Sequence, residues 1–89
     1  MTLRIVAMCR FLIKNRELVI SKQLLRSGTS IGANITEAEQ AESKRDFIHK
    51  LAIANKEAFE TEYWLYLLKD SHDLSEQQAS SMLADCNSI

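Results

Sequence analysis

The chain has no proline and only two glycines among its 89 residues, and only 7% of it is aromatic. Proline interrupts helices and glycine weakens them, so their scarcity leaves long helices uninterrupted. Hydrophobic residues nevertheless make up 46% of the chain, which excludes a disordered segment. A chain of this length is too short for two independent cores. The composition therefore predicts one all-helical domain spanning residues 1–89.

Cysteines and long hydrophobic runs are also scarce. Cys9 and Cys86 lie near opposite ends of the chain and show neither metal-ligand nor redox spacing. The apolar N-terminal segment is interrupted by Arg4 and Arg10, so it is neither the core of a signal peptide nor a membrane-spanning helix. We expect two free thiols and a cytoplasmic location.

Neither sign of charge is in excess: 11 lysines and arginines stand against 12 aspartates and glutamates, a net charge of −1. This balance gives no global reason to expect nucleic acid or an acidic membrane as partner. The distribution is uneven, however, because basic residues gather in the N-terminal third. A solvated basic face is one interpretation, and contact with nucleic acid is the other. The residues for such contact are Arg4, Arg10, Lys14, Lys22 and Arg26.

Apolar residues recur every three or four positions along most of the chain, which is typical of amphipathic helices packed in a bundle. Ser21, Ser43 and Ser75 are expected N-caps, the last two in capping boxes with Asp46 and Gln78. The fold class predicted is all-α, an antiparallel up-down four-helix bundle. Its helices are expected over about residues 2–15, 21–40, 43–69 and 75–89.

The fourth predicted helix is short. At about 1.5 Å per residue it measures roughly 21 Å, against roughly 39 Å for the third. Half of the third helix would therefore lack its partner. We expect that the chain is shortened at Ile89; the alternative is that something else covers the gap.

Two features of the middle helices predict contacts between helices. Gly28 and Gly32 lie one turn apart inside the second helix, where small residues let a neighbouring helix approach closely. The third helix has a second apolar stripe besides its core seam, which a neighbouring subunit would cover most simply. The alternative interpretation is that the aromatic side chains of this stripe merely lie along the protein surface. This stripe includes Phe59, Tyr63 and Tyr66, with Trp64 nearby.

A row of polar residues follows one side of the second helix at spacings of four, four and three: Arg26, Ser30, Asn34 and Glu37. Glu57 on the third helix is among its expected partners. We interpret the row as a partly buried hydrogen-bonded network that fixes the register of the two helices. A solvated face and a ligand site are the alternatives.

The sequence contains no pattern of residues that is typical of a catalytic site. Asp46 and His49 form one imperfect copy of the Glu-x-x-His pair of di-iron bundles, and a second copy is missing. Ser27–Ser30 resembles a phosphate-cradling loop but lacks the Gly-Lys-Ser/Thr order and a preceding strand. No serine or cysteine has a histidine spaced for a relay. We expect no enzyme activity, catalytic residue, cofactor or metal.

The segments QLLRSGTSIGANITEAEQAESKRDFIHKL and KEAFETEYWLYLL resemble a known family. It comprises the small four-helix bundle proteins encoded by intervening sequences inside bacterial 23S ribosomal RNA genes. The block from Gln23 to Leu68 carries the resemblance. The polar members of the motif are Arg26, Ser30, Asn34, Glu37, Glu57 and Tyr63.

This resemblance implies an antiparallel up-down bundle, often assembled as a ring-shaped homopentamer, and supplies no catalytic residues. The family is related to the accessory proteins of diversity-generating retroelements, which bind nucleic acid and a reverse transcriptase through a basic surface. This chain differs from them because it is not basic. We therefore predict a non-enzymatic, homo-oligomeric assembly module with an undetermined biochemical role. The alternative is an RNA- or DNA-binding accessory factor that partners a reverse transcriptase.

Overall fold

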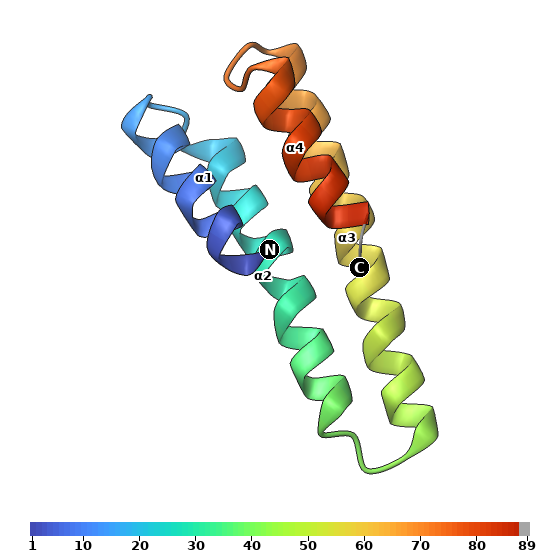
Figure 1. The fold of residues 1–89 in the computed structure, drawn as a ribbon. Coiled ribbons are helices and arrows are strands. Elements are labelled where there is room, and N and C mark those ends of the chain that lie inside the picture. Colours follow the sequence, from blue (N-terminus) through green and yellow to red (C-terminus); the bar gives the residue numbers. More distant parts are fainter. Residues whose placement is uncertain (88–89) are drawn as a thin grey trace.

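The structure, a computed structural model, describes residues 1–87. Each of its helices runs antiparallel to the one before it (Figure 1). The predicted all-α, up-down bundle is confirmed, and the helix boundaries agree within two residues where the structure describes them. The predicted end of the fourth helix lies outside the described residues. The helices are α1 (Thr2–Lys14), α2 (Val19–Glu39), α3 (Lys44–Asp70) and α4 (Glu76–Asn87).

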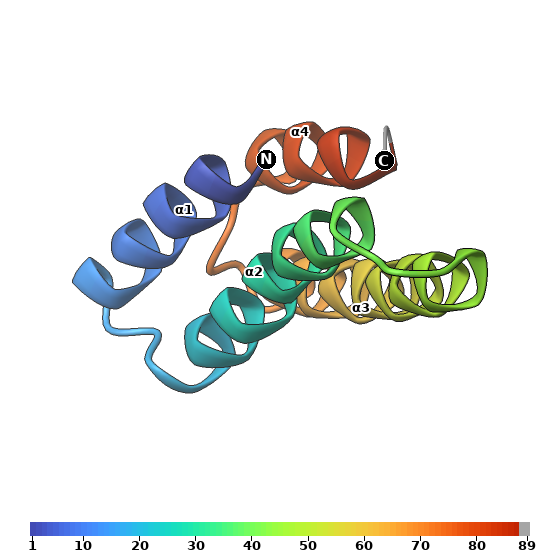
Figure 2. The ribbon, with the colours of Figure 1, turned by 90° about the horizontal axis from the view of Figure 1, so that it is seen from below.

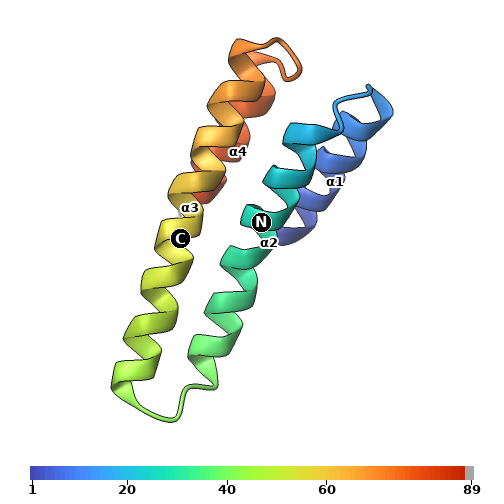
Figure 3. The same cartoon turned by 180° about the vertical axis from the view of Figure 1, so that it is seen from behind.

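The two longest helices, α2 and α3, form a hairpin that runs the length of the molecule (Figures 1 and 3). The shorter α1 packs against α2, and α4 packs against α3. Seen from below, α1 and α4 lie on the same side of the hairpin (Figure 2). Both cover only the half that is remote from the α2–α3 turn (Figure 1). The molecule is consequently elongated, with extents of 43 × 19 × 17 Å.

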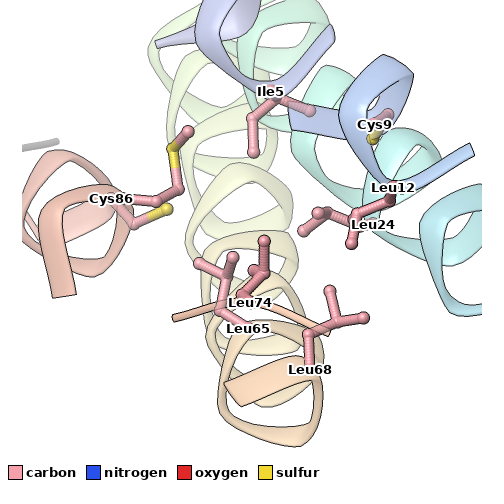
Figure 4. Close-up of a cluster of buried hydrophobic side chains, with 9 residues drawn as sticks. Ile5, Cys9, Leu12, Leu24, Leu65, Leu68, Leu74 and Cys86 are labelled. Carbon is pink, nitrogen blue, oxygen red and sulfur yellow. The ribbon is translucent and has the colours of Figure 1, made fainter. Parts of the chain in front are cut away.

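The hydrophobic core lies in the half where all four helices meet. Its side chains come from α1, α2, α3, α4 and the turn before α4, and they point toward one another (Figure 4). Ile5, Leu12 and Leu65 are completely buried. The core cluster comprises Ile5, Cys9, Leu12, Leu24, Leu65, Leu68, Leu74, Met82 and Cys86.

Serine caps start two of the helices as the sequence predicts. The Ser43 hydroxyl accepts a hydrogen bond of 3.1 Å from the Asp46 backbone N–H. At α4 both bonds of the capping box form: Ser75 Oγ accepts from the Gln78 N–H at 3.0 Å, and Gln78 Oε1 accepts from the Ser75 N–H at 2.8 Å. These bonds satisfy backbone donors that have no partner within the helix.

The predicted N-cap at Ser21 is wrong. Helix α2 begins at Val19, and the Glu17 carboxylate accepts from the Ile20 N–H at 2.6 Å. A carboxylate so close to the helix N-terminus satisfies a free donor and also interacts favourably with the helix dipole. Ser21 lies inside the helix and is 1% exposed.

Two turns at one end of the molecule contain a residue in left-handed conformation. Arg16 has φ 67° and His72 has φ 65°. Each lies just after a helix C-terminus, and the backbone N–H groups around it form the same hydrogen bonds in both turns. The Glu17 N–H donates to the Leu12 carbonyl at 2.8 Å, and the Asp73 N–H donates to the Leu68 carbonyl at 3.0 Å. This is the Schellman motif, usually built on glycine.

Candidate functional site

The most exposed aromatic surface of the protein lies on α3. Phe59 is 65% exposed, Tyr63 59% and Tyr66 49%. The aromatic members of the predicted second stripe are therefore exposed to solvent. Lys69 Nζ lies 5.3 Å from the centroid of the Tyr66 ring, which places a cation at the edge of this surface. We name it the α3 outer face; its members are Ile48, Ala52, Phe59, Tyr63 and Tyr66.

Trp64 does not belong to the α3 outer face. Its side chain packs against the hydrophobic core, and its ring meets that of Tyr63 edge-on with centroids 5.0 Å apart. One residue advances a helix by about 100°, so neighbours of an outward-facing tyrosine turn toward the bundle. The Trp64 indole N–H is buried without an acceptor among the described residues.

Both glycines of α2 face α1. A Cβ atom on Gly28 would lie 2.7 Å from Ile5 Cγ2, and a Cβ on Gly32 would lie 2.7 Å from Thr2 Oγ1. The first neighbour is completely buried, whereas Thr2 is exposed at the N-terminus. The helix that packs closely against the two glycines is therefore α1 of the same chain.

The polar row on α2 divides into separate groups. Arg26 forms ion pairs with Glu57, at 3.4 Å, and with Glu60 on α3. Asn34 instead donates to Ser30 of its own helix, to the carbonyl at 2.9 Å and to the hydroxyl at 3.1 Å. The next paired member, Glu37, accepts from Lys50 at 3.3 Å. The row is partly buried: the Arg26 and Glu37 side chains are 49% and 56% exposed, whereas the Glu57 side chain is 14% exposed and Asn34 is 9% exposed.

The buried polar link between α2 and α3 involves two residues outside the predicted row. The Thr61 hydroxyl donates to Ser27 Oγ at 2.9 Å, and both side chains are completely buried. The sequence places Thr61 in the core seam of α3, which was a usable signal for burial. Its partner could be identified only once the register of the two helices was known.

The five basic residues predicted to contact nucleic acid fall into two groups. Arg4 pairs with Asp85 at 3.0 Å and donates to Ser81 at 2.8 Å, and Arg26 pairs with α3 as described. The other three are exposed and form no ion pair within residues 1–87. These three are Arg10, Lys14 and Lys22.

A groove of about 560 Å³ begins where α4 ends, over the uncovered half of the hairpin. Its lining is mainly apolar and includes Ile35, Leu51, Ala58 and Phe59, with Glu62 as its charged group. Cys86 closes one end. Burial, helped by the carboxylates of Glu62 and Asp85, raises the pKa of the Cys86 thiol to about 11. The thiol is therefore neutral at physiological pH and a weak nucleophile.

Within residues 1–87 no three histidine, cysteine or acidic side chains are grouped so that they could hold a metal ion. In the same range no helix is both long and apolar enough to cross a membrane. What the described surface offers is an apolar aromatic face, an apolar groove and a group of exposed basic residues.

Comparison with known proteins finds a matching family model and similar solved structures. The family model described as "23S rRNA-intervening sequence protein" matches residues 1–89. A crystal structure of a protein with unknown function from the S23 ribosomal protein family of Bacteroides thetaiotaomicron is 55% identical, with a TM-score of 0.96. That alignment covers 98% of this chain and 82% of the other. A comparison with curated proteins finds no match.

Proposed function

The chain belongs to the family of 23S rRNA-intervening sequence proteins, and we propose that it is a cytoplasmic, non-enzymatic assembly module made of several copies of itself. The observation that carries this proposal is the α3 outer face. Three large aromatic rings lie on it within two turns, each about half exposed or more. Monomeric proteins rarely expose a contiguous apolar patch of this kind, and aromatic residues are enriched at protein interfaces.

The subunit count we propose is five, which is the count that the family resemblance implies. A second copy is the simplest cover for the α3 outer face because it needs no other gene product. Burial of an aromatic side chain contributes about 2 kcal/mol or more relative to leaving it in water. Three rings in each contact would offset a substantial part of the entropic cost of association.

The test is a pair of double variants at the same two positions, studied by sedimentation velocity. Phe59→Ser with Tyr63→Ser removes the rings, and we expect it to lower the assembled fraction strongly while the helical content is retained. Phe59→Tyr with Tyr63→Phe keeps the rings and is the matched control, which should assemble like the parent. Equal assembly of the parent and both variants would refute a role of the α3 outer face.

The second candidate function is RNA or DNA binding as an accessory factor, with a reverse transcriptase as a further partner. It is favoured by Arg10, Lys14 and Lys22, which are exposed and form no ion pair in the part of the chain that the structure describes. Phosphate contacts release counterions, so binding of this type weakens steeply with added salt. Titration of a labelled RNA at about 50 mM and about 200 mM salt tests it. Absence of binding at the lower concentration would exclude this candidate.

A further inference from the structure

The two turns at one end of the molecule carry opposite charges. The α1–α2 turn and the flanking helical residues expose Arg10, Lys14, Arg16 and Lys22. The acid in this stretch, Glu17, is engaged in capping α2. None of these four cations forms an ion pair among the described residues. We name these four residues, together with the adjoining Ile13, Leu18 and Val19, the basic corner.

The α3–α4 turn is acidic. Asp70 ends α3, Asp73 lies in the turn and Glu76 begins α4, and none of them forms an ion pair within residues 1–87. The neighbouring Lys69 is placed over the Tyr66 ring, and His72 occupies the left-handed position. We name the three acids the acidic corner. A surface depression of about 430 Å³ lies beside Asp70 and Glu76, and its lining also includes Lys69, His72, Leu74 and Ser75.

The antiparallel topology puts both corners at the same end of the long axis. The α1–α2 turn and the α3–α4 turn lie at one end of the molecule, and the α2–α3 turn lies at the other (Figures 1 and 3). Two copies standing next to each other with the same end up would therefore bring unlike corners to the same height.

Each corner also has exposed apolar side chains beside its charges. On the basic corner Leu18 is 60% exposed and Val19 76%. Next to the acidic corner, Tyr66 lies one turn before Asp70 and is 49% exposed. Opposite charges around apolar contacts are the arrangement that steers association and fixes its register.

We propose that the basic corner of one copy docks on the acidic corner of a second copy, with the two copies side by side and the same end up. This inference rests on the proposed self-assembly and adds which surfaces meet. The occupant of the depression on the acidic corner is then a basic side chain of the neighbour. Because the two surfaces differ, a docked pair keeps one free basic corner and one free acidic corner, so that assembly continues until it closes on itself.

This pairing makes assembly sensitive to ionic strength. Exposed charges are screened beyond about 8 Å at physiological salt, and charges at the rim of an interface act mainly through such exposed pairs. A contact in which two α3 outer faces meet symmetrically would lack this charge dependence, since it places like charges around the same apolar patch.

Charge reversal at the two corners tests the proposal. One variant carries Arg10→Glu and Lys22→Glu, and the other carries Asp70→Lys and Glu76→Lys. We expect each variant alone to associate at least about tenfold more weakly than the parent. An equimolar mixture should form complexes containing both chains, because the unaltered basic corner of the second variant can dock on the unaltered acidic corner of the first. Circular dichroism verifies that each variant is folded.

Lys44→Glu with Arg45→Glu is the matched control. It makes the same change of charge on exposed residues at the opposite end of the molecule, and it should assemble like the parent. If both corner variants keep the parent's assembly, the corners do not meet, while the proposed self-assembly stands. If the parent itself is monomeric, both proposals fail.

A one-sided result would also overturn the inference. Loss of assembly in the Arg10→Glu, Lys22→Glu variant alone would mean that the basic corner binds something other than the acidic corner. If added RNA restored the parent's assembly under conditions where the protein alone is monomeric, the basic corner would be a phosphate-binding surface instead.

Discussion

At the scale of single residues, Gly28 is the position where the packing of α1 on α2 tolerates least change. A Cβ atom there would lie 2.7 Å from Ile5 Cγ2 and 3.0 Å from two further carbons of the same side chain. Ile5 is completely buried in the hydrophobic core. Gly28→Leu is therefore expected to lower the free energy of unfolding by about 3 kcal/mol or more. Chemical denaturation measures it.

Gly32→Ala is the matched control for that prediction. The atom nearest to its added Cβ is the hydroxyl of Thr2, an exposed terminal side chain that can rotate away. Alanine also favours the helix over glycine by about 1 kcal/mol, so we expect this variant to be neutral or more stable. Equal destabilisation by both substitutions would contradict the contact described for Ile5.

The two cysteines give a prediction about pH. Burial raises the pKa of the Cys9 thiol, like that of Cys86, from the ordinary 9.0 to about 11. The unfolded chain then loses thiol protons at lower pH than the folded chain does. Stabilisation by the neutral thiols is complete below pH 9 and is lost as the pH rises toward 11.

Unfolding free energies measured between pH 8 and pH 11 test this sign, with Cys9→Ala plus Cys86→Ala as the reference for all other titrating groups. The parent should lose more stability over this range than the reference does. Parallel curves would mean that the thiols ionise equally in both states. Native thiols should also react with alkylating reagents far more slowly than thiols in denaturant, because both side chains are almost completely buried.

At the scale of helices and turns, the left-handed residues after α1 and α3 are replaceable. A non-glycine residue in this conformation costs about 1 kcal/mol or more. Arg16→Gly and His72→Gly should each raise the stability by up to about 1 kcal/mol, because glycine adopts φ near 65° without a steric penalty. Thermal unfolding measures the gain.

Asn15→Gly is the control for the turns. Asn15 has φ −93°, a conformation open to any residue, and its side chain donates to the Phe11 carbonyl at 2.8 Å. Glycine there should bring no gain and should cost stability through the lost bond. A stabilising Asn15→Gly would show that chain flexibility, not the left-handed conformation, limits this turn.

The helices themselves could be predicted because their signals are local. The Ser43 and Ser75 caps need only neighbours three residues away. Ser21 was assigned wrongly because the helix begins two residues earlier, where the Glu17 carboxylate accepts from the Ile20 N–H. The Ser27–Thr61 bond escaped prediction for a different reason: it joins residues 34 apart, and its partners are set by helix register.

The surface features divide in the same way, into those set by local spacing and those set by where the other helices lie. The α3 outer face follows from a period of about 3.5 residues alone, so sequence was sufficient. The inward turn of Trp64 and the pairing of Arg4 with Asp85 depend on where the other helices lie. Within the polar row, Arg26 pairs with its expected partner Glu57 on α3, whereas Asn34 bonds within α2, a choice that the sequence does not reveal.

At the scale of the whole molecule, the protein is a long hairpin whose two short helices cover one half. This leaves an apolar groove beyond α4 and an aromatic face along α3 in water. The end with four helices also carries opposite charges on its two turns. An isolated copy thus leaves exposed several surfaces that are suited to contact. On this basis we propose that the protein assembles with copies of itself.

The most direct test of that claim is the solution mass of the purified chain, measured by light scattering over a range of concentrations at low and at high salt. We predict a stable multiple of the 10.1 kDa chain mass at low salt, with a shift toward smaller species as salt is added. A mass of 10.1 kDa at every concentration would contradict the claim.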